Sequence, residues 1–446
     1  MVKVPCPVTV ELEPTQTSLV IGCPGVPRSV PRIETKLLIR SINGQPFTLR
    51  SVGIELRTTQ RVSIPSTLGS NESTQEYKLY EDPFVFNPTF GNFTAENLIG
   101  LDLPVLISLP KDIISSGYNL NWNASTVHNL IVRVMVGESA ETETGFMESF
   151  PIAVKLYDAL PIYRQFTESI NESVISGDQQ LIVEYKLQES CLGPGDSLNL
   201  AVKIMKNSLN YNVSSKLRVK TLNFQLKEVL ECHEGGLPPY KDITIIEDLK
   251  DGKELNLNNE ISLNYGFKLP TNSDFLSIFD KNESSLQKYT YFDSYQDNVP
   301  VHIDNHMNHK QNQVKLIEGI PMTHYQNFTT VGKLFSIRYE ILLKLKLVHG
   351  KDFTVRIPIV LSPYNKTSSE YLLNWIINQC KISSEIFGKT LINQLAQSYN
   401  TKDSTSSLSR FKAPLQIYKS NRNDWVKLGF SFDSFGTPQP IGSYID

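Results

Sequence analysis

The sequence predicts an all-β protein with two tandem β-sandwich domains and a C-terminal helical extension. Two observations lead to this prediction. Apolar and polar residues alternate along many short segments, as in half-buried strands, and turns containing Gly, Pro or Asn separate these segments. After about residue 366 the apolar residues recur instead at the spacing of a helix.

The clearest pair of strands lies between residues 335 and 361. Every second residue from Phe335 to Leu347 is apolar, and the residues between them are mostly polar or charged. A strand places such a set on one face, whereas a helix would scatter it. Residues 349–352 supply a polar turn, and the alternation resumes from Phe353 to Leu361. This segment therefore predicts an antiparallel hairpin.

A second hairpin is expected near the N-terminus. Alternation from Ile33 to Ile39 leads to Asn43-Gly44, a dipeptide that is typical of two-residue hairpin turns. We therefore predict that residues 47–56 return as the partner strand. The alternation slips by one residue after Leu49, which indicates a β-bulge.

The number of expected strands is too large for one sandwich. The segment Ala159–Arg164 separates two strand-rich regions and marks a boundary. We therefore place an N-terminal sandwich at residues 1–157 and a linker at 158–180. A C-terminal sandwich follows at 181–365, and the helical extension occupies 366–446.

Three features interrupt the strand pattern. Residues 277–327 are long, polar and rich in Asn and Asp, which predicts an insertion in the C-terminal sandwich. Helical spacing from Glu370 to about Gln397 predicts one or two helices. The Ser/Thr-rich stretch 398–410 is typical of a linker.

Composition limits the classes of function. The formal net charge of −3 over 446 residues argues against a dedicated nucleic-acid binder. The chain shows no signal peptide, no apolar run of membrane-spanning length, and five scattered cysteines without C-x-x-C spacing, so we expect a cytosolic protein. We find no recognised catalytic motif and expect neither enzymatic activity nor a cofactor.

One histidine cluster has spacing that would suit a metal. His302, His306 and His309, with Asp304 between them, supply ligand types that zinc prefers. The surrounding sequence is polar and offers nothing to fix their geometry. We therefore interpret these side chains as solvated loop residues and predict no metal site.

Two segments have the form L-P-x-Y, which WW domains bind as polyproline II helices. The first consists of Leu237, Pro238, Pro239 and Tyr240, for which the alternative is an ordinary Pro-rich turn. The second contains Leu160, Pro161 and Tyr163, and its position at the predicted domain boundary favours packing between domains.

Basic residues are frequent near the N-terminus. Those considered for a patch are Arg28, Arg32, Lys36, Arg40 and Arg50. Together they would attract an acidic peptide, a phosphorylated tail or anionic lipid. The alternative is a solvated outer strand face, which is the more common role of charged strand residues.

The layout resembles the arrestin family, and in particular the fungal α-arrestins. Gly193-Pro194-Gly195-Asp196 and the following Leu198 are similar to the opening of an arrestin C-domain. The closing hairpin of residues 335–361 and the opening Pro24–Arg28 with its following strands are similar to the family pattern. The resemblance covers about residues 8–363 and implies two immunoglobulin-like sandwiches joined by a short hinge.

The resemblance also implies a function. Fungal α-arrestins recruit a NEDD4-type HECT ubiquitin ligase, through its WW domains, to cytosolic tails of plasma-membrane transporters, which are then ubiquitinated and endocytosed. In this chain the ligase would meet Leu237, Pro238 and Tyr240, and the basic residues would meet cargo. The expected location is the cytoplasm, with recruitment to plasma membrane or endosomes and peripheral membrane contact. The alternatives are a trafficking or developmental scaffold without ligase contact, and a β-rich enzyme.

Overall fold

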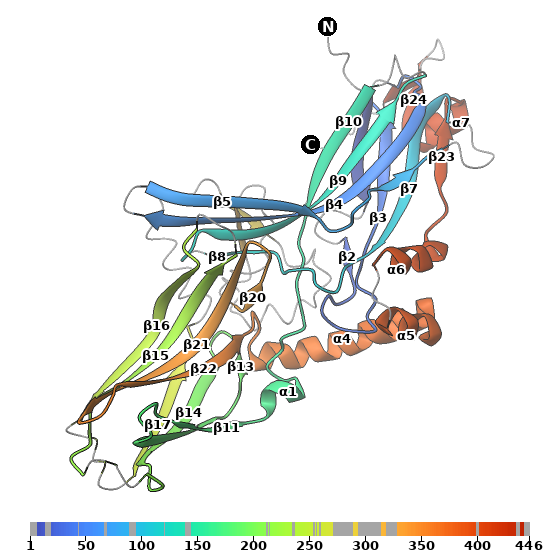
Figure 1. Cartoon of the computed structure of the whole chain (residues 1–446). Helices are drawn as coiled ribbons and strands as arrows, with labels where there is room; N and C mark the ends of the chain where they lie inside the picture. Colours follow the sequence, from blue (N-terminus) through green and yellow to red (C-terminus); the bar gives the residue numbers. More distant parts are fainter. Residues whose placement is uncertain are drawn as a thin grey trace.

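The computed structural model is mostly β, with two sandwich halves and a helical segment that contacts both (Figure 1). The all-β prediction is thus confirmed at the level of fold class. The structure describes residues 7–13, 19–42, 44–66, 69–88, 95–119, 121–138, 144–210, 213, 215–233, 237–252, 255, 257, 260–270, 289–292, 314–317, 328–397, 401–433 and 438–440.

The N-terminal half contains two sheets that face each other across one apolar core. The first sheet has the order β1-β3-β7-β23, with β2 paired to β3, and the second has the order β10-β9-β4-β5, with β6 on β4 and β8 on β9. The strands of the first sheet are β1 (Val8–Glu13), β2 (Val20–Ile21), β3 (Arg32–Ser41), β7 (Leu98–Ser108) and β23 (Gln416–Lys419). Those of the second are β4 (Leu49–Ser66), β5 (Gly69–Lys78), β6 (Phe84–Phe86), β8 (Gly117–Asn119), β9 (Ala124–Val136) and β10 (Thr144–Ile152).

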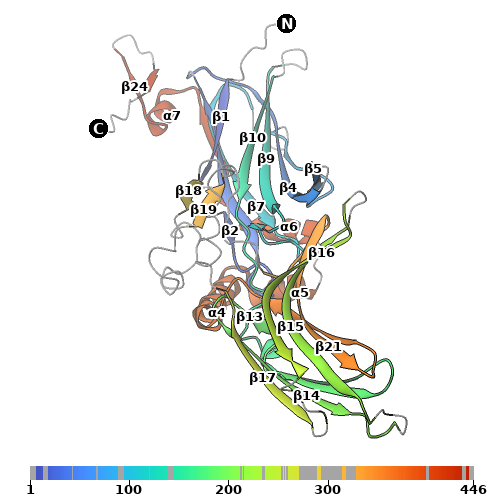
Figure 2. The ribbon, with the colours of Figure 1, turned by 90° about the vertical axis from the view of Figure 1, so that its left-hand side faces the viewer.

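The C-terminal half repeats this two-layer arrangement. One sheet has the order β11-β12-β14-β17, and the other has the order β13-β22-β21-β15-β16, with β20 on β21. The strands of the first are β11 (Ile170–Ile175), β12 (Leu181–Leu187), β14 (Ser197–Lys206) and β17 (Ile261–Lys268). Those of the second are β13 (Cys191–Leu192), β15 (Arg218–Cys232), β16 (Tyr240–Asp251), β20 (Thr330–Val331), β21 (Phe335–Val348) and β22 (Phe353–Leu361). Figure 2 shows the two halves arranged end to end.

Two local predictions are confirmed. β21 and β22 form an antiparallel hairpin in which Leu345 lies opposite Phe353. Between Leu49 and Ser51 the pairing of β4 with β9 shifts register, as a bulge requires. Alternating apolar residues thus located these strands correctly, because a bulge or a turn leaves a visible break in the pattern.

The hairpin expected around Asn43-Gly44 is wrong. β3 pairs with β1, β2 and β7, whereas β4 pairs with β5, β6 and β9, so the connection between them crosses from one sheet to the other. Both strands bury alternate residues in the same core, Leu37 from one side and Leu56 from the other. Alternation determines which face a strand buries but not which strand it pairs with. Asn43 itself lies outside the described residues.

Strand β4 is long enough to belong to both halves. Its first part contributes Leu56 to the N-terminal core, and its second part contributes Val62 and Ile64 to the core of the C-terminal half. The β4–β5 ladder therefore extends over the C-terminal half, as Figure 1 shows. The polar segment 277–327 lies largely outside the described residues, which include within it only the paired strands β18 (Tyr289–Phe292) and β19 (Val314–Ile317).

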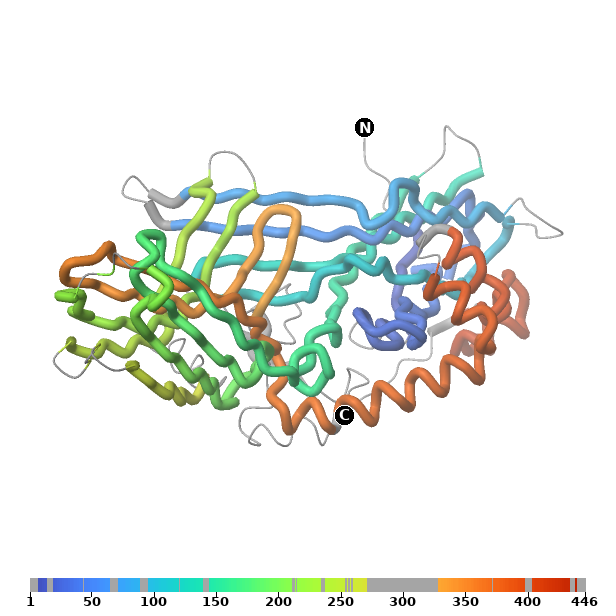
Figure 3. The backbone as a smooth tube through the Cα atoms, turned by 60° about the horizontal axis from the view of Figure 1, so that its bottom comes forward, coloured from blue at the N-terminus to red at the C-terminus, as the bar shows by residue number. Residues whose placement is uncertain are grey.

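After β22 the chain becomes helical, as predicted. The elements are α4 (Lys366–Phe387), α5 (Lys389–Gln397), α6 (Thr401–Leu408), η5 (Ser409–Phe411), α7 (Arg422–Lys427), β24 (Phe430–Phe432) and β25 (Pro438–Pro440), and a single turn, α1 (Arg164–Thr167), lies between the halves in the sequence. Asn365 caps α4 by accepting a hydrogen bond of 2.8 Å from the Ser368 amide. Figure 3 shows α4 running from the C-terminal half toward the N-terminal half.

The extension differs from its prediction in two respects. The stretch 398–410, expected as a linker, contains α6, whose Leu408 is fully buried. The extension also supplies β23, which adds to the first N-terminal sheet. Both elements depend on tertiary contacts with the N-terminal half, which local composition does not reveal. Residues 366–397 and 401–419 are called the strap below.

Candidate interaction site

The two halves meet around the buried carboxyl group of Glu228 on β15. Its Oε2 accepts a hydrogen bond of 2.6 Å from the Tyr339 hydroxyl on β21. Its Oε1 accepts bonds of 3.0 Å from the Asn121 amide and 3.4 Å from the Asn119 amide, which belong to the β8–β9 region of the other half. Burial raises the pKa of Glu228, although these donors act in the opposite direction. A buried carboxyl with donors from both halves ties the halves together.

A second polar contact lies beside it. The Gln60 side chain on β4 accepts hydrogen bonds from the amides of Lys333, at 2.9 Å, and Leu334, at 3.1 Å. Its own amide donates to the Thr126 hydroxyl at 3.3 Å. A Cβ atom on Gly332 would lie 2.7 Å from the Phe335 carbonyl oxygen and 2.2 Å from Gln60 Nε2, so a side chain here would clash with the backbone as well as with Gln60. The amide group of Gln60 is therefore held on both sides of the junction.

The strap covers the junction with apolar contacts. Tyr157 and Leu160, at the end of the N-terminal half, pack with Tyr364, Leu372 and the neighbouring α4 residues in one buried cluster. The rings of Tyr157 and Tyr364 stack with their centroids 5.7 Å apart. This cluster joins the last strand of the C-terminal half, the start of α4 and the N-terminal half.

Further along, the strap packs on the N-terminal half. The Thr405 hydroxyl accepts a hydrogen bond of 3.1 Å from the Ser108 amide at the end of β7. The Ser383 hydroxyl donates to the Ser29 carbonyl at 2.7 Å. The Arg32 guanidinium lies 4.9 Å from the centre of the Phe387 ring. These contacts fix α4 against the start of β3 and the loop that precedes it, and α6 against the end of β7.

The strap ends as an edge strand, β23. It pairs antiparallel with β7, and the Tyr418 hydroxyl donates to Asp102 at 2.9 Å. Arg40 forms an ion pair of 2.5 Å with the same carboxylate and lies 5.2 Å from the centre of the Tyr418 ring. The halves and the strap therefore form a continuous packed body, which suits a platform that presents surfaces in a fixed relation.

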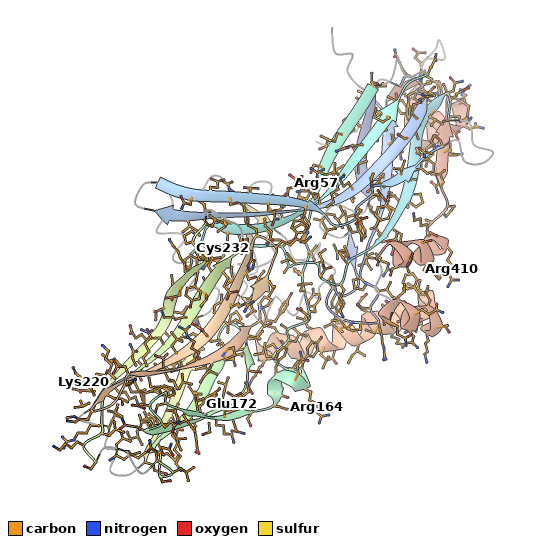
Figure 4. The ribbon with its side chains drawn as sticks, in the orientation of Figure 1. Arg57, Arg164, Glu172, Lys220, Cys232 and Arg410 are labelled. Atoms are coloured by element: carbon orange, nitrogen blue, oxygen red, sulfur yellow. The ribbon has the colours of Figure 1, made fainter. Side chains whose placement is uncertain are left out.

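An open groove of about 540 Å³ lies in the C-terminal half of this platform. It lies on the β11-β12-β14-β17 sheet and is lined by charges of both signs, among them Glu184, Lys186 and Lys203, around the small side chain of Ala201. Figure 4 marks Glu172, another lining residue, on this half. An open, mixed-charge surface of this kind is typical of protein contacts rather than of enclosed catalysis.

The L-P-x-Y segments occupy different environments. Leu237 packs partly on the C-terminal core, and Tyr240 begins β16, where its hydroxyl donates to Glu340 at 3.2 Å. Pro238 and Pro239 stay in the preceding turn, and Tyr240 is 45% exposed. A WW-domain contact at this segment stays a prediction.

The second segment is integrated into the platform. Leu160 is fully buried in the cluster with α4, and Tyr163 packs partly against it. The Tyr163 hydroxyl donates to the Tyr157 carbonyl at 3.0 Å. Pro161, between them, is also buried. This segment therefore packs at the junction of the two halves.

The five basic residues do not form one patch. Arg32 is buried beneath Phe387 and paired with Glu34 at 2.7 Å, and Arg40 is paired with Asp102. Arg50 is exposed and lies on β4, in the opposite sheet from Lys36 and Arg40. The reason is the misassigned hairpin, since these residues would share a face only if β3 and β4 were partners. Lys36 pairs with Glu13 at 3.7 Å, and Arg28 is exposed in the loop before β3.

Within the described ranges, no group of three or more His, Cys, Asp or Glu side chains is arranged to hold a metal ion. The cluster His302, Asp304, His306 and His309 lies outside those ranges. In the same part of the chain, no helix is both long and apolar enough to cross a membrane. Glu228 was missed in the sequence, although it alternates with the buried Leu226 and Leu230 on β15.

Comparison with known proteins gives one informative match. No protein-family model matches the sequence. The chain is similar to the RHO1 GEF localizing protein 1 of Saccharomyces cerevisiae, with 22% identity over 457 residues. The alignment covers 91% of this chain and 90% of the yeast protein, so the similarity extends over nearly the whole length of both.

This match overturns the function expected from the arrestin resemblance. A protein similar over nearly its whole length is named for localizing a RHO1 GEF, not for recruiting a HECT ubiquitin ligase to transporters. The ligase-adaptor function is therefore wrong for this chain. It rested on the resemblance to fungal α-arrestins together with short L-P-x-Y segments, and such short motifs recur by chance in sequences of this length.

Proposed function

We propose that this chain is a non-enzymatic scaffold that localizes a guanine-nucleotide exchange factor (GEF) for a RHO1-type GTPase. The observation that supports the proposal most strongly is the similarity to the yeast RHO1 GEF localizing protein over about nine-tenths of both chains. We propose that the scaffold acts in the cytosol and carries its GEF to a membrane. Two arrestin-like sandwiches would form its body, with the Gly193–Leu198 turn as the opening of the second.

The geometry is consistent with a scaffold. Buried polar contacts at Glu228 and Gln60 join the halves, and the strap packs on both. A localizing protein must hold a partner and a target at the same time, and a rigid body keeps the two surfaces in a fixed relation. Its two interaction surfaces therefore need no conformational change to act together.

We assign the GEF contact to the groove on the β11-β12-β14-β17 sheet. The small Ala201 lies among its charged lining residues, and its partly buried position leaves room for a side chain of the partner. Charged rims of both signs select a partner by electrostatic complementarity. The edge strand β11 borders the same surface.

The test is retention of the purified GEF by the immobilised full chain. The parent chain is expected to retain it, and Ala201→Arg is expected to weaken binding by on the order of tenfold or more, because a central contact is blocked. Val426→Arg is the matched control, since Val426 is 58% exposed on α7, in the other half.

Failure of the parent chain to retain the GEF contradicts the proposed function. Equal retention by the parent and the Ala201→Arg variant contradicts only the assignment of the groove. Circular dichroism of both variants shows whether each has kept the parent β-sheet content.

A further inference from the structure

A second cavity lies between the strap and the N-terminal half. It has a volume of about 220 Å³ and is formed by the loop before β3, the turn after β7, and helices α5 and α6. It lies in the opposite half from the groove assigned to the GEF. Below it is called the strap cleft.

Apolar side chains form much of the wall of the strap cleft. Those from the loop before β3 are Val26, Pro27, Val30 and Pro31, and those from α5 are Ile392, Leu395 and Ala396. A cavity of about 150 Å³ holds a benzene molecule, so a cavity of this size accepts one aromatic ring with a small substituent. By itself, this wall would favour binding of an apolar group.

Two cations also line the strap cleft. Arg28 and Lys111 are both exposed and come from different elements, and neither forms an ion pair with any residue that the structure describes. Most other arginines of the N-terminal half are paired, for example Arg32 with Glu34. Two cations that converge on one cavity favour a doubly charged anion.

A polar group without a partner completes the cleft. Ser404 on α6 lines it and is 3% exposed, and its hydroxyl oxygen has no hydrogen-bond partner in the described structure. A buried hydroxyl without a partner is unfavourable by about 1–3 kcal/mol, so its presence points to a ligand that accepts a hydrogen bond from it. The adjacent Thr405, by contrast, is used to bind Ser108.

One carboxylate, Asp158, lines the cleft as well. The backbone amides of Asp158 and Ala159 donate hydrogen bonds to it. Burial raises its pKa, so the ionised carboxylate is disfavoured relative to the neutral acid. Asp158 also packs against Gly25, where a Cβ atom would lie 2.7 Å from the Asp158 side chain. Its carboxylate is therefore held within the wall, and the two cations outnumber it.

We propose that the strap cleft binds a phosphate monoester attached to a small apolar body. Arg28 and Lys111 hold the phosphate, Ser404 donates a hydrogen bond, and the α5 wall contacts the apolar part. The source is either a soluble phosphate ester or the headgroup of an anionic lipid, since both carry the same group. The proposal does not depend on the proposed function.

The first probe is phenyl phosphate, which matches the cleft in size and charge. Binding to the full chain is measured by calorimetry, with phenol as the uncharged comparison. We expect phenyl phosphate to bind and phenol to bind at least tenfold more weakly. The double variant Arg28→Gln, Lys111→Gln should weaken phenyl phosphate binding tenfold or more. Ala396→Phe, at an exposed position of α5, should abolish it by filling the cleft.

The control variant is Arg50→Gln, Lys220→Gln, which removes the same charge elsewhere. Arg50 is exposed on β4, and Lys220 lies far from the strap, at the distant end of the C-terminal half (Figure 4). The second probe compares vesicles of phosphatidylcholine alone with vesicles that also contain phosphatidic acid, and it distinguishes a lipid source from a soluble one. Binding of either probe that is lost only in the cleft variants supports the proposal. No binding of either probe, or equal loss in the control, overturns it.

Discussion

The junction between the halves gives the sharpest prediction, through Tyr339→Phe. The substitution keeps the ring of a side chain that is 2% exposed and removes only the hydroxyl that donates to Glu228 at 2.6 Å. The carboxyl group then retains two longer bonds, from Asn121 and Asn119. Leaving a buried acceptor short of a strong donor costs about 1–3 kcal/mol, which is the loss of stability that we expect.

The assay is urea unfolding at neutral pH, followed by circular dichroism and by tyrosine and tryptophan fluorescence. The matched control is Tyr265→Phe. Tyr265 is 3% exposed in the same core, but its hydroxyl has no hydrogen-bond partner in the described structure, so its removal should cost less than about 0.5 kcal/mol. Equal losses in the two variants would refute the claim that the Glu228 contact stabilises the junction.

Four further predictions concern other positions. The free energy of unfolding of Glu228→Gln should rise relative to that of the parent as the pH rises. Burial raises the Glu228 pKa, so the parent loses stability when its carboxyl ionises. Urea midpoints measured from pH 4 to 8 test this. Burial lowers the pKa of His128 to about 4, so the free energy of unfolding of the parent should fall by about 3 kcal/mol between pH 6.5 and 4. His128→Gln should not show this loss in the same titration. Gly193→Ala places a Cβ atom 2.0 Å from the Tyr364 carbonyl oxygen and should lower thermal stability by at least about 2 kcal/mol in calorimetry. Leu408→Ala should cost about 2–5 kcal/mol and speed hydrogen exchange in β23, and unchanged exchange there would contradict a continuous strap.

Much of the fold was visible in the sequence because strands with one buried face leave a period of two. For the segments Phe335–Leu347 and Phe353–Leu361, both the buried faces and the pairing could be predicted, because a short turn joins the two strands. Pairing could not be predicted across the sandwich. Residues 33–39 and 47–56 show the same alternation, whether they are neighbours in one sheet or face each other across the core.

The strap could be predicted only in part. The apolar spacing of residues 370–397 revealed α4 and α5, whereas β23 is only four residues long and exists because β7 offers a free edge. The strap cleft is likewise formed by five segments that are distant in sequence, and no local pattern links Arg28 to Ser404.

The junction did leave a trace in the sequence. Leu226, Glu228 and Leu230 occupy successive alternate positions on β15, so the acidic residue is in phase with buried leucines. A charged side chain at a core position is rare unless it is paired or hydrogen-bonded. This signal identifies Glu228 as a buried carboxyl, but its partners Asn119 and Asn121 are far away in sequence.

The most direct measurement of the central claim is imaging of a fluorescent RHO1 GEF in yeast cells that lack the similar yeast protein. Expression of the full chain, at the level of the yeast protein, should return the GEF to the position it holds in unmodified cells, and Ala201→Arg should fail while Val426→Arg succeeds. A GEF that remains displaced when the parent chain is expressed and folded would contradict the proposal that this protein localizes it.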